Sequence, residues 1–180
     1  MTGHRDARRA GALALAALLA LAAAGPARAQ TQAPRRHVEE VRDGRRVAIL
    51  VSRAYIVDAR DPARAAFDHY RKALAGEPPR PHPAGHRAVA RQLNKYITRH
   101  RSVSAVETVE EADFVVVFNV LRTRRSFVPD EPYVYGQLFV IARPPGQPPR
   151  IVWESEDNNM GVDDAVEEFL DAFKAARGEK

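Results

Sequence analysis

Hydrophobic positions between residues 47 and 177 form strand-like runs and helix-like stripes, and these predict the secondary structure. Four segments are rich in β-branched and aromatic residues and are bounded by charged residues or prolines, as is typical of strands. They are residues 47–57, 114–121, 133–142 and 151–154, with a shorter β segment expected within 103–109. The first two are apolar at successive positions, so we expect strands that are buried on both faces.

Three segments carry apolar residues at helical spacing. The most regular has them at i, i+3, i+4, i+7, i+8 and i+11, namely Val162, Ala165, Val166, Phe169, Leu170 and Phe173. Asp163 or Asp164 is expected to cap this last helix. An earlier helix is predicted to begin with the capping residue Asp61, followed by Pro62, and to end at Gly76. A helix between these two is expected over residues 86–100.

Proline-rich connectors separate some of these elements and complete the predicted fold. Residues 77–85 and 143–150 each hold several prolines, which are incompatible with a helix interior or a central strand. The order β-α-α-(β)-β-β-β-α predicts an α+β fold. In it, two to three amphipathic helices pack on one face of a mostly antiparallel sheet of about four strands. We expect one domain over residues 47–177, after a flexible lead-in at residues 30–46.

The first 29 residues have the three-part pattern of a secretion signal peptide. Arginines precede an Ala/Leu-rich stretch over residues 10–24, and small residues then predict cleavage near Ala29-Gln30. The alternative is an uncleaved membrane anchor, but this stretch of 15 residues is shorter than the roughly 20 that span a bilayer. We therefore expect a periplasmic or secreted product with no transmembrane segment after cleavage.

Composition narrows the classes of function that are open to such a product. Removing residues 1–29 takes away four Arg and one Asp, which lowers the formal charge from +5 to +2. This small charge and the absence of a recognised nucleic-acid motif argue against a nucleic-acid partner. The remaining charges are segregated, with +9 over residues 30–101 and −7 over residues 102–180. The chain has no cysteine, which excludes disulfides and cysteine-based metal sites.

Two groups of cations are the candidate contact surfaces. The first is a stripe at i, i+4, i+8 and i+12 along the helix expected at residues 86–100, made of Arg87, Arg91, Lys95 and Arg99. The second lies in the turn after the strand at residues 114–121, where cations adjoin an aromatic residue: Arg122, Arg124, Arg125 and Phe127. A charged stripe of this kind is also typical of a simply solvated helix face.

Catalytic and metal-binding patterns are weak, and we predict no cofactor and assign no catalytic residue. His82 and His86 have the spacing of some metal ligands, but Pro83 and Gly85 between them oppose a helix that would align the rings. Acidic residues that a hydrolase would need occur after the last strand and in the long turn before residue 133: Asp130, Glu131, Glu154, Glu156 and Asp157. Asn119 interrupts a buried strand and should find a hydrogen-bond partner.

Glu111-Ala112-Asp113 precedes the run FVVVFNV, and the segments YGQLFVIA and IVWES and the closing amphipathic helix follow it. Through these features, residues 86–177 resemble small periplasmic α/β modules of the TolB amino-terminal and CsgG-like type, and related secreted domains of unknown function. The resemblance implies a role in envelope assembly or accessory binding, with Ala112, Asp113 and Trp153 at structural positions.

The sequence thus favours an exported, non-catalytic accessory or binding module of the cell envelope. Its partner would be an acidic envelope protein or an anionic surface, contacted through the two groups of cations. One alternative is a small secreted hydrolase or metal-dependent enzyme that uses His82 or His86 with nearby acids. Another is a binder of anionic lipid or glycan. The oligomeric state is not indicated by any pattern in the chain.

Overall fold

The computed structural model describes residues 35–53, 60–78, 80–126 and 132–179. The predicted signal peptide at residues 1–29 lies outside these ranges, as does Phe127. No helix in the described ranges combines the length and the apolar composition needed to cross a bilayer. The elements in chain order are η1 (Val38–Val41), β1 (Arg46–Arg53), α2 (Pro62–Leu74), α3 (Pro83–His100), β2 (Ser104–Ala105), β3 (Phe114–Arg124), β4 (Tyr133–Ala142), β5 (Arg150–Glu154), β6 (Met160–Gly161) and α4 (Val162–Arg177).

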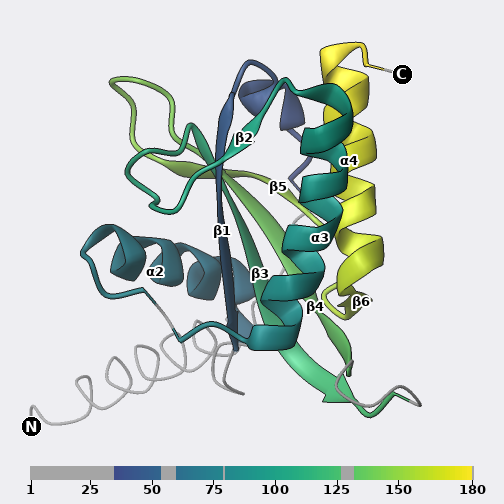
Figure 1. The fold of residues 1–180 in the computed structure, drawn as a ribbon. Helices are drawn as coiled ribbons and strands as arrows, with labels where there is room; N and C mark the ends of the chain where they lie inside the picture. The colour runs from purple at the N-terminus through teal and green to yellow at the C-terminus, as the bar shows by residue number, and fades with distance from the viewer. Residues whose placement is uncertain (1–34, 54–59, 79, 127–131, 180) are drawn as a thin grey trace, which may run out of the picture. The chain divides into compact units, whose positions relative to one another are not determined.

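The strands form one six-stranded mixed sheet in the order β2-β1-β3-β4-β5, with β6 paired to β4 (Figure 1). Strand β1 is parallel to both β2 and β3, whereas β3, β4 and β5 form an antiparallel meander. The predicted α+β class is confirmed. The sheet has six strands where about four were expected. The two-residue strand β2 lies within the short β segment expected at residues 103–109, whereas the two-residue strand β6 carries too little pattern to be recognised in the sequence.

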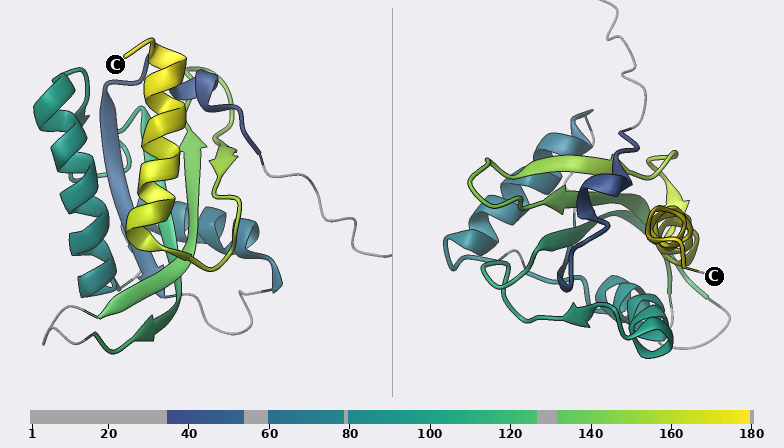
Figure 2. Two further views of the ribbon diagram at one scale, coloured as in Figure 1. Left: turned by 90° about the vertical axis from the view of Figure 1, so that its right-hand side faces the viewer. Right: turned by 90° about the horizontal axis from the view of Figure 1, so that it is seen from above.

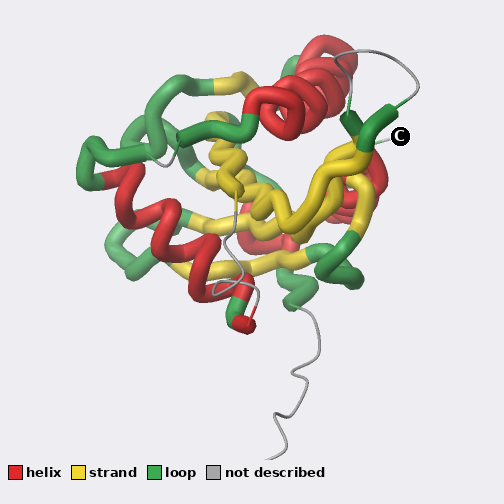
Figure 3. Tube along the Cα trace, turned by 90° about the horizontal axis from the view of Figure 1, so that it is seen from below, coloured by secondary structure: helices red, strands yellow, loops and turns green. Residues whose placement is uncertain are grey.

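Helices cover both faces of this sheet, which corrects the expectation that they share one face. Helices α3 and α4 pack on what we call the first face, and α2 packs on the second face (Figures 2 and 3). Along β3, Val116 points into the core under α3 and α4, while Val115 and Val117 point into the core under α2. The unbroken apolar run of β3 is therefore explained by burial on both sides.

Helix α3 begins at Pro83, three residues before the predicted start. Proline is tolerated in the first turn because its missing N–H would have no helical partner there. His82 precedes it as the capping residue, and its Nδ1 accepts a hydrogen bond of 3.1 Å from the Gly85 amide. Gly85 lies so close to β1 that an added Cβ would stand 2.9 Å from a methyl group of Val51, so glycine is needed at this crossing.

The other helix ends follow the predicted chemistry in part. Asp61 caps α2 by accepting a 3.0 Å hydrogen bond from the Arg64 amide, and Gly76 after the helix has a positive φ, as expected. The capping residue of α4 is Gly161, not Asp163 or Asp164, which lie in the first helical turn. Acidic residues in that turn still favour the helix dipole.

The part of the lead-in that the structure describes is ordered, and Asp113 fixes the start of the sheet that follows it. Of the predicted lead-in at residues 30–46, the described part includes the 3₁₀ helix η1, whose Val38 and Val41 are buried in the core. Asp113 joins the starts of β1 and β3, because its carboxylate accepts hydrogen bonds from the backbone amides of Arg45 and Arg46 and from the Arg46 guanidinium. Partial burial alone would raise the pKa of Asp113, but these hydrogen bonds outweigh it and hold the pKa below its usual value.

Candidate functional site

The predicted basic stripe lies where α3 runs beside α4 on the first face. The two helices point in the same direction (Figure 1), and four exposed cations of α3 follow the line between them: Arg87, Arg91, Lys95 and Arg99. Helix α4 is acidic on its corresponding side near its start and basic near its end. We call the part formed by Arg87, Arg91, Asp163 and Asp164 the lower seam, and the part formed by Lys95, Arg99, Glu167 and Lys174 the upper seam.

Charges in the lower seam are paired across the two helices. The Arg91 guanidinium lies 3.1 and 3.2 Å from the two carboxylate oxygens of Asp163, and the Gln92 side chain donates to the same carboxylate at 2.8 Å. A hollow of about 490 Å³ opens here, lined by Arg87, Arg91, Asp163 and Asp164 together with residues 133–135 of β4. Its two cations are matched by two anions, so this hollow has no strong preference for an anionic partner.

Charges in the upper seam are unbalanced. A second hollow of about 350 Å³ lies between the helices, and its cations are Lys95 and Arg99 from α3 and Lys174 from α4. Among the residues that line it, Glu167 is the only acid. Lys174 also approaches Asp171 at 2.6 Å on the outer surface, but an exposed pair one turn apart on a helix holds its side chains weakly. The net positive lining makes this hollow the strongest candidate contact site.

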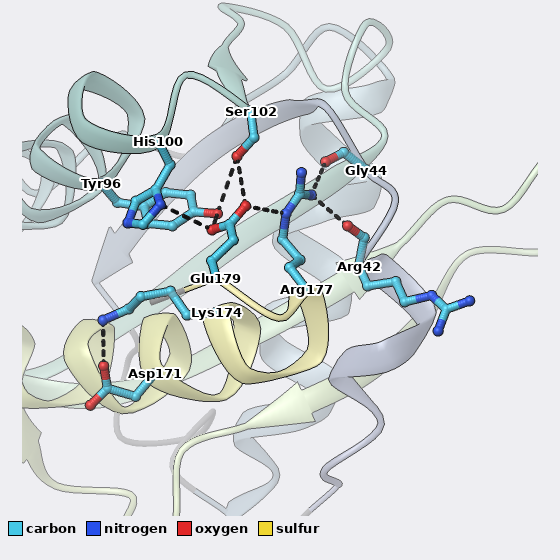
Figure 4. A network of polar contacts seen from close by, with 9 residues as sticks. All are labelled: Arg42, Gly44, Tyr96, His100, Ser102, Asp171, Lys174, Arg177 and Glu179. Carbon is cyan, nitrogen blue, oxygen red and sulfur yellow. Dashed lines mark hydrogen bonds and ion pairs between the residues drawn. The ribbon is translucent and has the colours of Figure 1, made fainter.

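A network of polar contacts closes the upper end of the seam, and Figure 4 shows its residues. The Glu179 carboxylate accepts hydrogen bonds from the Tyr96 hydroxyl at 2.5 Å, from the Ser102 hydroxyl at 3.0 Å and from the Arg177 guanidinium at 2.8 Å. The Arg177 guanidinium also donates to the backbone carbonyls of Arg42 and Gly44. This network, which we call the carboxyl-end latch, ties the end of α4 to the end of α3 and to the start of β1.

The pKa values of two latch residues, Tyr96 and Glu179, are shifted by burial and by their contacts. Burial, and next the hydrogen bond to Glu179, raise the pKa of Tyr96 to about 12. Burial alone would raise the pKa of Glu179, but the hydrogen bonds from Tyr96, Arg177 and Ser102 outweigh it and lower that pKa. The Glu179 carboxylate also lies 3.4 Å from His100 Nδ1, so the latch holds its charge through contacts that include two residues of the upper hollow, Tyr96 and His100.

Arg122 and Arg124 of the predicted turn belong to strand β3, at the far end of the β3–β4 ribbon. Arg122 stacks on Tyr135, with 4.6 Å between its guanidinium carbon and the ring centroid, and Arg124 is paired with Tyr133 across the ribbon. Val134 between the tyrosines is buried in the first-face core, and Tyr133 and Tyr135 also line the hollow of the lower seam with Arg87 and Arg91. The tyrosines of the ribbon thus border the lower end of the stripe, whereas no residue of the ribbon lines the hollow of the upper seam.

Tyr133 and Tyr135 were not among the predicted site residues. Tyr133 is 54% exposed, which is unusual for a large aromatic side chain. The alternation Tyr-Val-Tyr opposite Arg-Thr-Arg was a usable signal, because alternate residues of paired strands share one face. Arg125 is exposed beside this ribbon.

The two histidines do not form a joint ligand pair. Burial and the charge of Arg53 lower the pKa of His82, which favours the neutral ring that accepts the Gly85 amide through Nδ1. His86 is exposed in the first turns of α3. In the described ranges, no group of three or more His, Cys, Asp or Glu side chains is placed to hold a metal ion.

The predicted acids of the β5 end have local structural roles. Glu154 accepts a hydrogen bond from the Arg35 amide, and Asp157 accepts one from the Asn159 amide. The Glu156 amide donates to Glu168. Asp130 and Glu131 lie outside the described residues.

A serine–histidine contact that the sequence did not reveal lies on the second face. Ser52 Oγ is 2.5 Å from His69 Nδ1, and both atoms are 3.2 Å from Asn119 Oδ1. The Asn119 amide donates to the Pro62 carbonyl, which confirms that this buried residue finds partners. Ser52 is only 1% exposed, so its hydroxyl joins β1, β3 and α2 in the core and is not presented to a substrate.

Neither the protein-family models, nor the curated proteins, nor the solved structures contain a match to this chain.

Proposed function

We propose that the chain is an exported, non-catalytic binding module of the cell envelope, and that its upper seam contacts an anionic partner. One observation carries the proposal: Lys95 and Arg99 of α3 and Lys174 of α4 converge on a hollow whose lining contains a single acid. Cations that come from two elements and share a concave surface strengthen the local field more than the same cations on an isolated helix.

The lower seam is a poorer contact for such a partner. An incoming carboxylate or phosphate there would have to compete with Asp163 for Arg91. It would also lie beside the negative charge of Asp164. The proposal therefore divides the predicted stripe, since it assigns recognition to Lys95 and Arg99 and a structural role to Arg91.

The Arg–Tyr surface of the β3–β4 ribbon is proposed as a separate, second contact. It consists of Arg122, Arg124, Tyr133 and Tyr135, and none of these residues lines the hollow of the upper seam. Arginine and tyrosine are enriched in the centres of protein interfaces.

Three further observations support the assignment to an envelope binding module. The signal-peptide pattern of residues 1–29 favours export. The resemblance to TolB amino-terminal and CsgG-like modules suggests accessory binding. The rival hypothesis of a metal-dependent enzyme is weakened because His82 already uses Nδ1 to cap α3.

The proposal is tested by affinity capture from an envelope extract with tagged residues 30–180. The variant K95Q/R99Q is compared with R87Q/R91Q, which removes the same formal charge from the lower seam. Circular dichroism first establishes that both are folded. We expect a partner that the wild type and R87Q/R91Q retain and that K95Q/R99Q loses. Capture that depends equally on both pairs, or on neither, contradicts the proposal.

A further inference from the structure

We infer that the hollow of the upper seam is a binding site for a phosphate monoester carried by a small hydroxylated group. This inference rests on the proposed function and specifies the anion that the same residues recognise. It covers polyol phosphates in solution and lipid headgroups of the same chemistry.

The arrangement of the cations fits a tetrahedral anion. Lys95 and Arg99 are separated by one turn of α3, and Lys174 approaches from α4 on the other side of the hollow. A phosphate monoester offers three unesterified oxygens and close to two negative charges, so each cation can meet its own oxygen. A carboxylate offers only two oxygens and one charge, and it would leave one of the three cations without a partner.

The lining charge also matches a dianion. Apart from His100, which lies 3.4 Å from the Glu179 carboxylate, the lining has three cations and Glu167, which give a net charge of +2. The carboxyl-end latch preserves this balance, because Tyr96, Ser102 and Arg177 hold the Glu179 carboxylate. The contact between Lys174 and Asp171 is an exposed pair, so the ammonium group can turn toward a stronger anion at little cost.

The remaining lining indicates what carries the phosphate. Glu167 borders the hollow and can accept hydrogen bonds from hydroxyl groups, whereas Tyr96 and Leu170 supply apolar surface. At about 350 Å³ the hollow is at the small end of ligand sites, and it exceeds the size of a single acidic side chain. A polyol of the size of glycerol or a sugar fits both the volume of the hollow and its hydrogen-bonding lining. The carrier should also be uncharged, because Glu167 would repel an anionic one.

Calorimetric titration of the folded chain, residues 30–180, tests the inference. The probes are glycerol 3-phosphate, succinate as a dicarboxylate of equal charge, and vesicles with and without phosphatidic acid. The variant K95Q/R99Q is compared with K72Q/R80Q, which makes the same two exchanges at exposed positions away from the seam. We expect glycerol 3-phosphate to bind the wild type and K72Q/R80Q alike, and K95Q/R99Q at least about tenfold more weakly, since two charge-assisted contacts are lost.

The remaining outcomes distinguish the source of the phosphate from failure of the inference. Binding to phosphatidic acid vesicles without binding of glycerol 3-phosphate, if it is lost in K95Q/R99Q alone, supports a lipid headgroup. Succinate bound as tightly as glycerol 3-phosphate overturns the inference, because the hollow would then respond to charge alone. If no phosphate probe binds while envelope capture still requires Lys95 and Arg99, the inference fails and the proposed function stands. If capture is also independent of these residues, both fail.

Discussion

The lower and upper seams are built from one regular stripe of cations on α3, yet their chemistry differs. In the lower seam Asp163 binds Arg91 and Gln92, so the charges serve to join the two helices. In the upper seam α4 contributes Lys174, and the hollow is left with a net positive lining. The difference teaches that the partner helix, and not the stripe itself, decides whether a basic helix face is structural or available for recognition.

The largest effect on stability is expected from a change in the aromatic packing beneath the upper seam. The ring of Phe173 lies 5.5 Å from Phe114, 5.4 Å from Phe169 and 5.8 Å from Tyr96 between ring centroids. We expect Phe173→Ala to lower the free energy of unfolding by about 3–5 kcal/mol, because it leaves a cavity in the core. Urea denaturation measures the loss. Val162→Ala removes a smaller side chain under the lower seam. If Phe173→Ala lowers the free energy of unfolding by no more than Val162→Ala does, the aromatic packing does not stabilise the upper seam as predicted.

The carboxyl-end latch makes the upper end of the seam sensitive to acid. The folded-state pKa of Glu179 lies below its ordinary value of 4.5, so the stabilisation is fully present above that pH and is lost as the pH falls through the folded-state pKa. We expect Glu179→Gln to cost about 1–2 kcal/mol at neutral pH, since charge-assisted hydrogen bonds are weakened. Unfolding measured from pH 7 down to pH 3 should show this difference shrinking. A constant difference across that range would count against the latch.

Removing the one acid that lines the upper hollow sharpens the comparison between the seams. We expect Glu167→Gln to strengthen binding of glycerol 3-phosphate by about threefold, because a nearby like charge is removed at a partly solvated site. Glu107→Gln, at an exposed position away from the seam, provides the control for the change in net charge. Equal strengthening in both variants would show that only the overall charge matters.

Uncoupling the lower seam should have the smallest effect. Asp163→Asn replaces an exposed ion pair, so we expect a loss of about 0.5 kcal/mol in the free energy of unfolding. Arg91 would then be released to attract anions, and the lower seam would acquire weak phosphate binding that the wild type lacks. Chemical denaturation and the same calorimetric titration check the two effects. A variant with unchanged stability and no new binding would show that the Arg91–Asp163 contact is not what separates the two seams.

Much of the fold could be predicted because local patterns determine it. The spacing of Val162 to Phe173 identified α4, and Asp61 with Pro62 identified the start of α2. The prediction that all helices pack on one face of the sheet was wrong. The apolar run of β3 already indicated helices on both faces, because a strand that is buried on both faces needs packing partners on both. Pro83 was read as a helix breaker, but at the first helical position it is favourable.

Only part of the candidate site, the stripe on α3, could be predicted from the sequence. The stripe on α3 is visible in the sequence because it repeats every four residues. Its division into a part that is paired with Asp163 and a part that lies beside Lys174 depends on which residues of α4 are its neighbours, and those are 71 or more positions away in the chain. The Ser52–His69–Asn119 contact was missed for the same reason, since it joins two strands and a helix that no local pattern relates.

The most direct test of recognition by the upper seam is an amide NMR titration of residues 30–180 with glycerol 3-phosphate. The account predicts saturable shifts at Lys95, Arg99 and Lys174, with the amides of Arg87 and Arg91 unchanged. Shifts centred on Arg87 and Arg91, or on the ribbon at Arg122 and Tyr135, would contradict it, because the anion would then bind where Arg91 is already paired with Asp163 or where Arg122 is stacked on Tyr135.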